Sequence, residues 1–226
     1  MSFTEPLPKV FSSSELLILD PARIDVDTAP EDNIEAVFAL YKRKGINPRL
    51  PQYRQEFTDS FLDRHKVRYA VGGYGEDRSL MLAGTLIAKQ GRSIHLGLDA
   101  WSKNLEPLLA PCDGSIIRTG YEEQSFGYGH YLIFQPVDKT MPYIFFGHLG
   151  SDLPALGTVK AGMEIAHLGD WRNNENGGWA RHVHIQMLRQ LPPEGETPIG
   201  YSSKADFELN SQKYPNPLGY FKNWHF

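Results

Sequence analysis

The stretch RHVHIQM, residues 181–187, places two imidazoles two positions apart among residues that suit a β-strand. Side chains at positions i, i+2 and i+4 of a strand point to the same face. His182 and His184 therefore share a face, with roughly 7 Å between their Cα atoms. The stretch HLGLD places His95 and Asp99 four positions apart, so the same rule predicts that they share a face of another strand.

Two imidazoles and one carboxylate form a ligand set that zinc accepts. A catalytic zinc ion takes three protein ligands and leaves its fourth position open to water. A single histidine on an apolar strand is more often a hydrogen-bonded core residue, so the prediction depends on the whole set. We expect a metal site here, provided that the strands bearing HLGLD and HVH are neighbours.

The rest of the chain indicates how these residues are positioned. Beyond residue 67, short segments suited to strands alternate with Gly, Pro, Asp and Asn. Two earlier segments, EDNIEAVFALYKRKG and QYRQEFTDSFLDRHK, have apolar residues at helical spacing. We expect a mainly β protein, α+β overall, with a helical or irregular N-terminal region over 1–67 and a β-rich domain over 68–226. The predicted strands lie in VRYAVGGYG, SLMLAGTLIA, RSIHLGLDAW, GSIIRTGYEE, HYLIFQPV, PYIFFGHLG, EIAHLG and HVHIQML.

Composition narrows the classes of partner. The 226 residues carry a formal charge of −4 and no long basic run, so nothing suggests a nucleic acid partner. No apolar stretch is long enough to cross a bilayer, and the start of the chain lacks the pattern of a secretory signal. We therefore expect a cytoplasmic protein without a membrane partner. Cys112 is the one cysteine and is expected to be a small buried thiol.

Six stretches follow one another over about residues 90–190: HLGLD, APCDGSI, GYGHYLIF, FFGHLG, VKAGMEIAHLG and HVHIQ. In this order they resemble the M23 metallopeptidases, the lysostaphin-like or LytM-like zinc endopeptidases with the duplicated hybrid motif fold. The signature of that family is H-x-x-x-D, a later lone histidine after a strand, and H-x-H. The resemblance implies an antiparallel sheet or partly open sandwich with a groove along it. It is greatest to the M23-like domains of bacterial fusion proteins that also carry a class III aminotransferase domain.

Carried over position by position, the resemblance implies that His95, Asp99 and His184 hold Zn²⁺. It implies that His148 and His182 stand beside the attacking water as catalytic residues, and either could be the general base. It implies no organic cofactor. The expected activity is hydrolysis of an amide bond in a peptide or peptide-like substrate.

Two departures from the family bear on the substrate. The family often has Tyr two residues before its lone histidine, where this chain has Phe146. The approach to HVH is the bulky, charged stretch GDWRNNENGGWAR, which should alter the ligand that fits. Two alternatives therefore stay open: a zinc-dependent hydrolase of esters or other acyl compounds, and a non-catalytic binding module that uses the same groove. The oligomeric state is also open.

Overall fold

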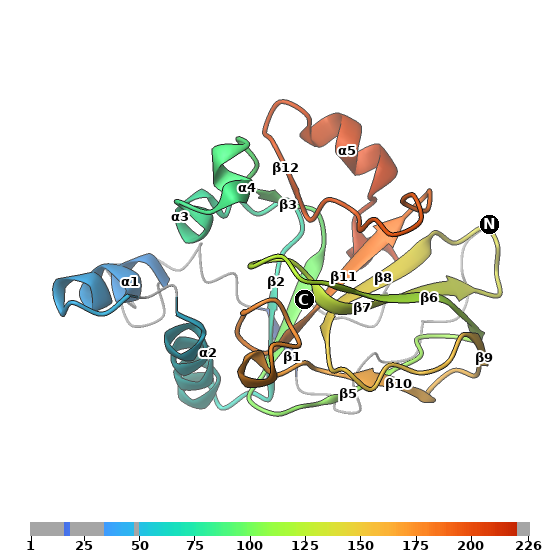
Figure 1. The fold of residues 1–226 in the computed structure, drawn as a ribbon, viewed down its shortest axis with the longest axis horizontal. Helices are drawn as coiled ribbons and strands as arrows, with labels where there is room; N and C mark the ends of the chain where they lie inside the picture. The colour runs from blue at the N-terminus through green and yellow to red at the C-terminus, as the bar shows by residue number, and fades with distance from the viewer. Residues whose placement is uncertain (1–15, 19–33, 48–49, 221–226) are drawn as a thin grey trace.

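The computed structural model of the protein describes residues 16–18, 34–47 and 50–220. Its centre is an eight-stranded sheet in the order β1-β2-β4-β11-β8-β7-β6-β9 (Figure 1). The β1–β2 pair is parallel and the other pairs in this sheet are antiparallel, which confirms the expected fold class. The strands are β1 (Leu16–Ile18), β2 (Tyr69–Gly72), β4 (Leu98–Ser102), β6 (Gly114–Glu122), β7 (Gly129–Pro136), β8 (Tyr143–Leu149), β9 (Gly157–Val159) and β11 (His182–Leu188).

Smaller elements surround this sheet. β10 (Glu164–His167) pairs with β5 (Pro107–Leu109), and β12 (Tyr201–Ser202) pairs with β3 (Ile94–His95). The two helices expected before residue 67 are present as α1 (Ile34–Arg43) and α2 (Pro51–His65). The same region also contributes β1 to the sheet, and the proposed domain boundary stays a prediction. The remaining helical elements are α3 (Ser79–Leu82), α4 (Leu86–Lys89), α5 (Phe207–Lys213), η1 (Trp171–Asn173) and η2 (Pro217–Gly219).

Among the described residues, no helix combines the length and the apolar character that a bilayer crossing requires.

The predicted strand in SLMLAGTLIA is wrong, because the segment forms the two short helices α3 and α4. Gly84 lies between them with a φ of 82°, a left-handed conformation that favours glycine. The Thr85 side chain then caps α4 by accepting a hydrogen bond from the Ala88 amide at 3.3 Å. A short apolar run without strict alternation fits a helix as well as a strand, and the cap decides in favour of the helix.

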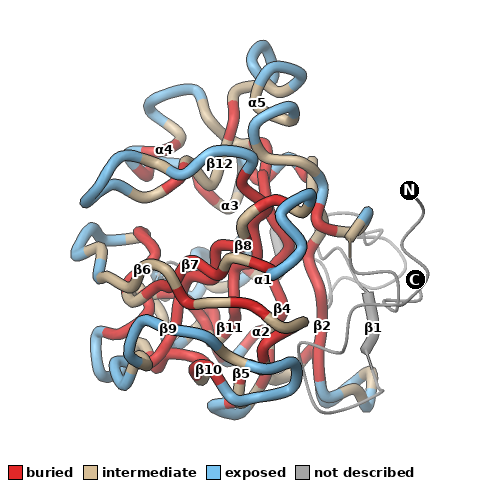
Figure 2. Tube along the Cα trace, turned by 90° about the vertical axis from the view of Figure 1, so that its right-hand side faces the viewer, coloured by how far each residue is buried: buried red, intermediate tan, exposed pale blue. Residues whose placement is uncertain are grey.

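β11 packs one face against the main apolar core and carries its histidines on the opposite face, where β7 and β8 hold a smaller hydrophobic cluster. In β11, Val183, Ile185 and Met187 join the main hydrophobic cluster on one face, while the intervening histidines project to the other. Figure 2 shows that the central strands are buried along most of their length. Alternation in β11 therefore supplies a core on one side and a set of buried polar groups on the other.

A candidate metal centre and its chamber

β4 and β11 are adjacent, so the condition attached to the metal site is met. In their antiparallel register His184 lies opposite Asp99. His95 does not share a strand with Asp99 as predicted, because β3 ends at His95 and β4 begins three residues later. A Cβ atom on the intervening Gly97 would come within 2.4 Å of the His184 ring, so this position leaves room for that imidazole. The three side chains still meet.

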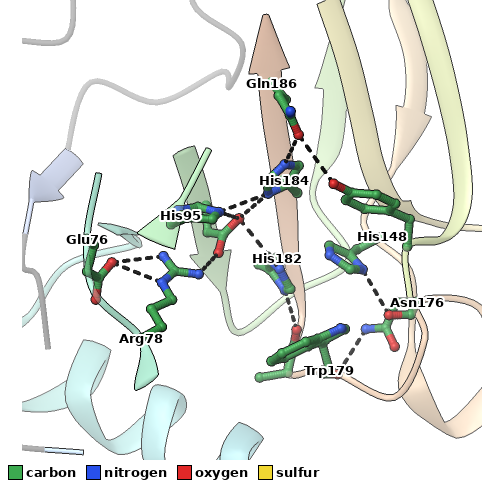
Figure 3. A network of polar contacts seen from close by, with 12 residues as sticks. Glu76, Arg78, His95, His148, Asn176, Trp179, His182, His184 and Gln186 are labelled. Carbon is green, nitrogen blue, oxygen red and sulfur yellow. Dashed lines mark hydrogen bonds and ion pairs between the residues drawn. The ribbon is translucent and has the colours of Figure 1, made fainter. Parts of the chain in front are cut away.

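The three predicted ligands offer atoms that converge on one point. One atom from each of His95, Asp99 and His184 lies within 4.8 Å of the others, and all three residues are buried. His184 Nδ1 is 2.9 Å from Asp99 Oδ1 and 3.1 Å from His95 Nε2. His95 Nε2 is 3.4 Å from the same carboxylate oxygen. The fold thus brings together atoms that are distant in the sequence (Figure 3).

The outer nitrogen of each ligand histidine is held by an oxygen. His95 Nδ1 donates to the Gly73 carbonyl at 3.0 Å, and His184 Nε2 donates to Gln186 Oε1 at 2.9 Å. Gln186 is fixed in turn, because its Nε2 donates to the Ile199 carbonyl at 3.0 Å. These bonds assign the protons to the outer nitrogens and leave lone pairs on the two inward nitrogens.

The donor set fits a divalent ion. Two imidazole lone pairs and a carboxylate oxygen face one another at 2.9–3.4 Å without a donor hydrogen between them, an arrangement that a cation stabilises. Ligand atoms at tetrahedral zinc are about 3.3 Å apart, given Zn–N distances of about 2.0–2.1 Å. The residues therefore match zinc in type, number and spacing, and such an ion supplies Lewis-acid polarisation and water activation.

The second oxygen of Asp99 is engaged by an arginine. Arg78 Nη1 donates to Asp99 Oδ2, and Arg78 Nη2 lies 2.9 Å from Glu76 Oε2. The Arg78 guanidinium is 5.7 Å from the centre of the Trp101 ring. A Cβ on Gly72 would lie 2.7 Å from Arg78 Nη2, so the glycine provides the space that the arginine occupies. The arginine therefore leaves Oδ1 as the oxygen that faces the two imidazoles.

The two predicted catalytic histidines lie together beside this centre. The ring centres of His148 and His182 are 4.2 Å apart, and His182 Nε2 is 3.8 Å from Asp99 Oδ1. His182 Nδ1 donates to the Ala180 carbonyl at 2.7 Å, and His148 Nδ1 donates to the Asn176 carbonyl at 3.0 Å. Each ring therefore keeps a lone pair on Nε2.

The backbone at His148 is unusual, and the anomaly explains where its ring lies. Ile144 and Phe146 of β8 belong to the apolar core, so alternation would direct His148 into the core as well. Its φ is instead 63°, a left-handed value that is uncommon outside glycine. The reversal brings the ring against His182, and Leu149 joins the core instead. Backbone strain of this kind tends to accompany functional positions.

Burial sets the charge states of the site. It lowers the pKa of His95 to about 4, with the nearby Arg78 charge acting in the same direction. Burial also lowers the pKa of His148 and that of His182, so these imidazoles are neutral at pH 7. By itself burial would raise the pKa of Asp99, but His95 and Arg78 hold it well below the ordinary value. The Asp99 carboxylate is therefore ionised at pH 7.

A cavity of about 230 Å³, here called the chamber, lies over the site. His148, His182 and His184 line one part of it, so a ligand in the chamber contacts the proposed catalytic residues. Helix α2 forms another wall through Phe57 and Phe61. Five more aromatic side chains line the chamber, Trp101, Phe126, Tyr128, Trp179 and Tyr201, together with charged side chains that include Arg54, Arg78, Asp99 and Glu122.

The remaining histidines among the described residues, and Cys112, do not line the chamber. His130 packs on Tyr121, with ring centres 4.6 Å apart, and His167 Nδ1 is 2.9 Å from Asp152 Oδ1. Burial raises the pKa of the Cys112 thiol to about 11, so it is a poor nucleophile at neutral pH.

Two of the sequence departures have structural answers. Phe146 faces the apolar core, so its side chain does not replace a hydroxyl at the site. Tyr128 packs 5.2 Å from the His184 ring, and its hydroxyl donates to Gln186 at 3.3 Å. Within the bulky loop, Trp179 lines the chamber, whereas Trp171 lines a separate hollow against α2.

Sequence reasoning missed the residues that support the ligands. Gln186 stands two residues after His184 in the same strand, so the period-2 rule could have identified it. Arg78 and Asn176 lie outside the main strands, and no spacing rule connects them to the site. Their roles depend on how the loops fold back over the sheet.

Solved structures of peptidases share features of this fold. The catalytic domain of lysostaphin, an antimicrobial peptidase from Staphylococcus simulans, is 19% identical, with 72% of this chain and 96% of that one covered and a TM-score of 0.47. The catalytic domain of EnpA, a prophage-encoded M23 protein from Enterococcus faecalis, is 20% identical. The match covers 49% of this chain and 76% of that one, with a TM-score of 0.37. A zinc-containing peptidase from Vibrio cholerae is 23% identical. The match covers 47% of this chain and 32% of that one, with a TM-score of 0.36.

Neither a protein-family model nor a curated protein matches the chain. The greater likeness to domains of aminotransferase fusion proteins stays a prediction.

Proposed function

We propose that the protein is a zinc-dependent hydrolase that cleaves an amide bond in a peptide or peptide-like substrate. The observation that carries the proposal is the convergence of three ligand atoms, within 4.8 Å of one another, at the edge of a chamber that two further histidines line. The order of the motifs resembles that of the M23 metallopeptidases, which supports the same activity. The cytoplasmic location stays a prediction.

His148 and His182 perform the proton transfers in this proposal. The Nε2 lone pair of one ring takes a proton from the water as it adds to the amide carbon. The same proton passes to the departing nitrogen as the C–N bond breaks, so the products are a carboxylic acid and an amine. The backbone carbonyls of Ala180 and Asn176 fix both rings through Nδ1 and so direct Nε2 away from the backbone.

The test combines metal analysis with a substrate screen. We expect about one zinc ion per chain and hydrolysis of a member of a blocked-peptide library. His148→Ala and His182→Ala should lower kcat by about 10²–10⁴-fold with zinc retained. His130→Ala is the matched control. His130 lies near the start of β7 and does not line the chamber, so this variant should leave kcat unchanged.

Esters in the same screen separate the two hydrolase hypotheses. Turnover of esters without turnover of any amide would replace the proposed peptidase activity with the acyl hydrolase. A preparation that neither holds zinc nor regains it on addition would contradict the proposal as a whole.

A further inference from the structure

Trp179 has a donor that the described residues leave unused. The residue is 7% exposed, and its Nε1 has no hydrogen-bond partner within the described ranges. An unpaired buried donor costs about 1–3 kcal/mol, so native structures seldom keep one without a reason. Because Trp179 lines the chamber, a ligand in the chamber could accept this hydrogen bond.

The position of Trp179 is tied to the catalytic histidines. Its ring centre lies 6.1 Å from that of His148 and 6.2 Å from that of His182, with edge-to-face geometry (Figure 3). Asn176 links Trp179 to His148. Its Nδ2 donates to the Trp179 backbone carbonyl, and its own backbone carbonyl accepts from His148 Nδ1. The Arg54 guanidinium lies 4.9 Å from the centre of the indole ring. The indole is therefore held where a ligand oxygen near the two histidines would lie.

The aromatic part of the chamber favours an apolar group. Phe57 and Phe61 project from α2, and Trp101 and Phe126 approach from the sheet and a loop. At about 230 Å³ the chamber is smaller than most sites for drug-sized ligands, which occupy about 300–1,000 Å³. It suits a short segment with one large side chain, whereas a glycine segment would leave the aromatic wall uncovered.

We infer that the chamber is a subsite for a short peptide that has an apolar side chain next to the reacting amide. The side chain packs against the aromatic wall, and a carbonyl oxygen accepts a hydrogen bond from Trp179 Nε1. Cleavage of the bound peptide rests on the hydrolase proposed above. The binding preference itself does not.

The experiment measures binding in the full-length, zinc-loaded His148→Ala protein, which should not turn the peptides over. Isothermal titration calorimetry compares acetyl-Gly-Phe-Gly-amide with acetyl-triglycine-amide. Burial of the phenylalanine side chain predicts at least about tenfold tighter binding for the first peptide. Trp179→Phe, which keeps a ring but removes the N–H, should weaken that binding by about threefold to tenfold.

Trp171→Phe is the matched control. Trp171 Nε1 also lacks a hydrogen-bond partner among the described residues, but it lines the separate hollow. This variant should bind the phenylalanine peptide as the parent does. If Trp179→Phe does not fold, the unchanged indole is tested with a peptide whose carbonyl is replaced by an (E)-alkene, and the same weakening is expected.

Equal affinity for the two peptides would overturn the inference, as would a Trp179→Phe effect no larger than that of Trp171→Phe. Other results would separate a failure of the proposed peptidase activity from a failure of the subsite. Peptides that bind in the expected order but are not cleaved by the unsubstituted protein would leave the subsite in place and remove the peptidase. Cleavage without side-chain preference would remove the subsite alone.

Discussion

Replacement of Arg78 by Met tests whether the electrostatics of the site follow from its geometry. The Arg78 side chain is 2% exposed and pairs with Asp99, which is 3% exposed. Removal of one partner from such a pair costs about 3–5 kcal/mol, because the other charge stays buried without compensation. Methionine fills much of the arginine volume beside Trp101, so lost packing should add little. In metal-free protein we expect the free energy of unfolding to fall by about 3–5 kcal/mol.

The loss in free energy of unfolding caused by Arg78→Met should depend on whether zinc is bound. A bound cation lies next to Asp99 and balances its charge in place of the arginine, so the loss should be smaller in zinc-loaded protein. Urea unfolding, followed by tryptophan fluorescence in EDTA and in excess zinc, measures both losses.

Lys103→Met is the control, because Lys103 pairs with Asp63 and both side chains are exposed, at 38% and 66%. We expect it to cost about 1 kcal/mol or less, equally with and without zinc. Equal losses for Arg78→Met in the two states would refute the reasoning, since the arginine would then act by packing and not by charge. If Arg78→Met does not fold, Glu76→Gln tests the same electrostatics with the opposite sign: it removes a carboxylate beside Arg78, so its loss of stability should not become smaller when zinc binds.

Three further variants probe other parts of the molecule. Gln186→Leu removes the acceptor that orients His184, and we expect zinc affinity to fall about 10–100-fold in a competition titration with a chromophoric chelator. Gly97→Ala directs a methyl group at the His184 ring, so the purified variant should hold much less than one zinc ion by elemental analysis; full occupancy would contradict the crowding argument. Phe134→Ala empties a fully buried core position and should lower the free energy of unfolding by about 3–5 kcal/mol, measured by urea titration, with zinc stoichiometry unchanged.

The part of the site that lies on regular strands could be predicted from the sequence. The period of two places His182 and His184 on one face of β11, and the apolar residues between them on the other. The antiparallel sheet was expected from the resemblance to the M23 metallopeptidases, and the strand pairing confirms it. The short break between His95 and Asp99 was missed, because the local pattern HLGLD is as compatible with one strand as with two.

Features set by tertiary structure could not be predicted in this way. The left-handed backbone at His148 contradicts strand alternation, and nothing in FFGHLG marks it. Arg78 lies 21 residues before Asp99 in a segment between β2 and α3, so its contact depends on the path of the intervening chain. The wall that α2 adds to the chamber likewise depends on how a helix from the N-terminal part docks on the sheet.

Strand β11 carries core residues on one face and the candidate site histidines on the other, so the packing of the core also fixes where the histidines lie. If β11 slipped by one residue against β4, Val183 and Ile185 would face the chamber. The imidazoles of His182 and His184 would then be buried in the hydrophobic core. The desolvation cost of such an exchange locks the alignment of the two strands. The alignment of the candidate metal ligands therefore depends on apolar packing on the opposite face of the sheet.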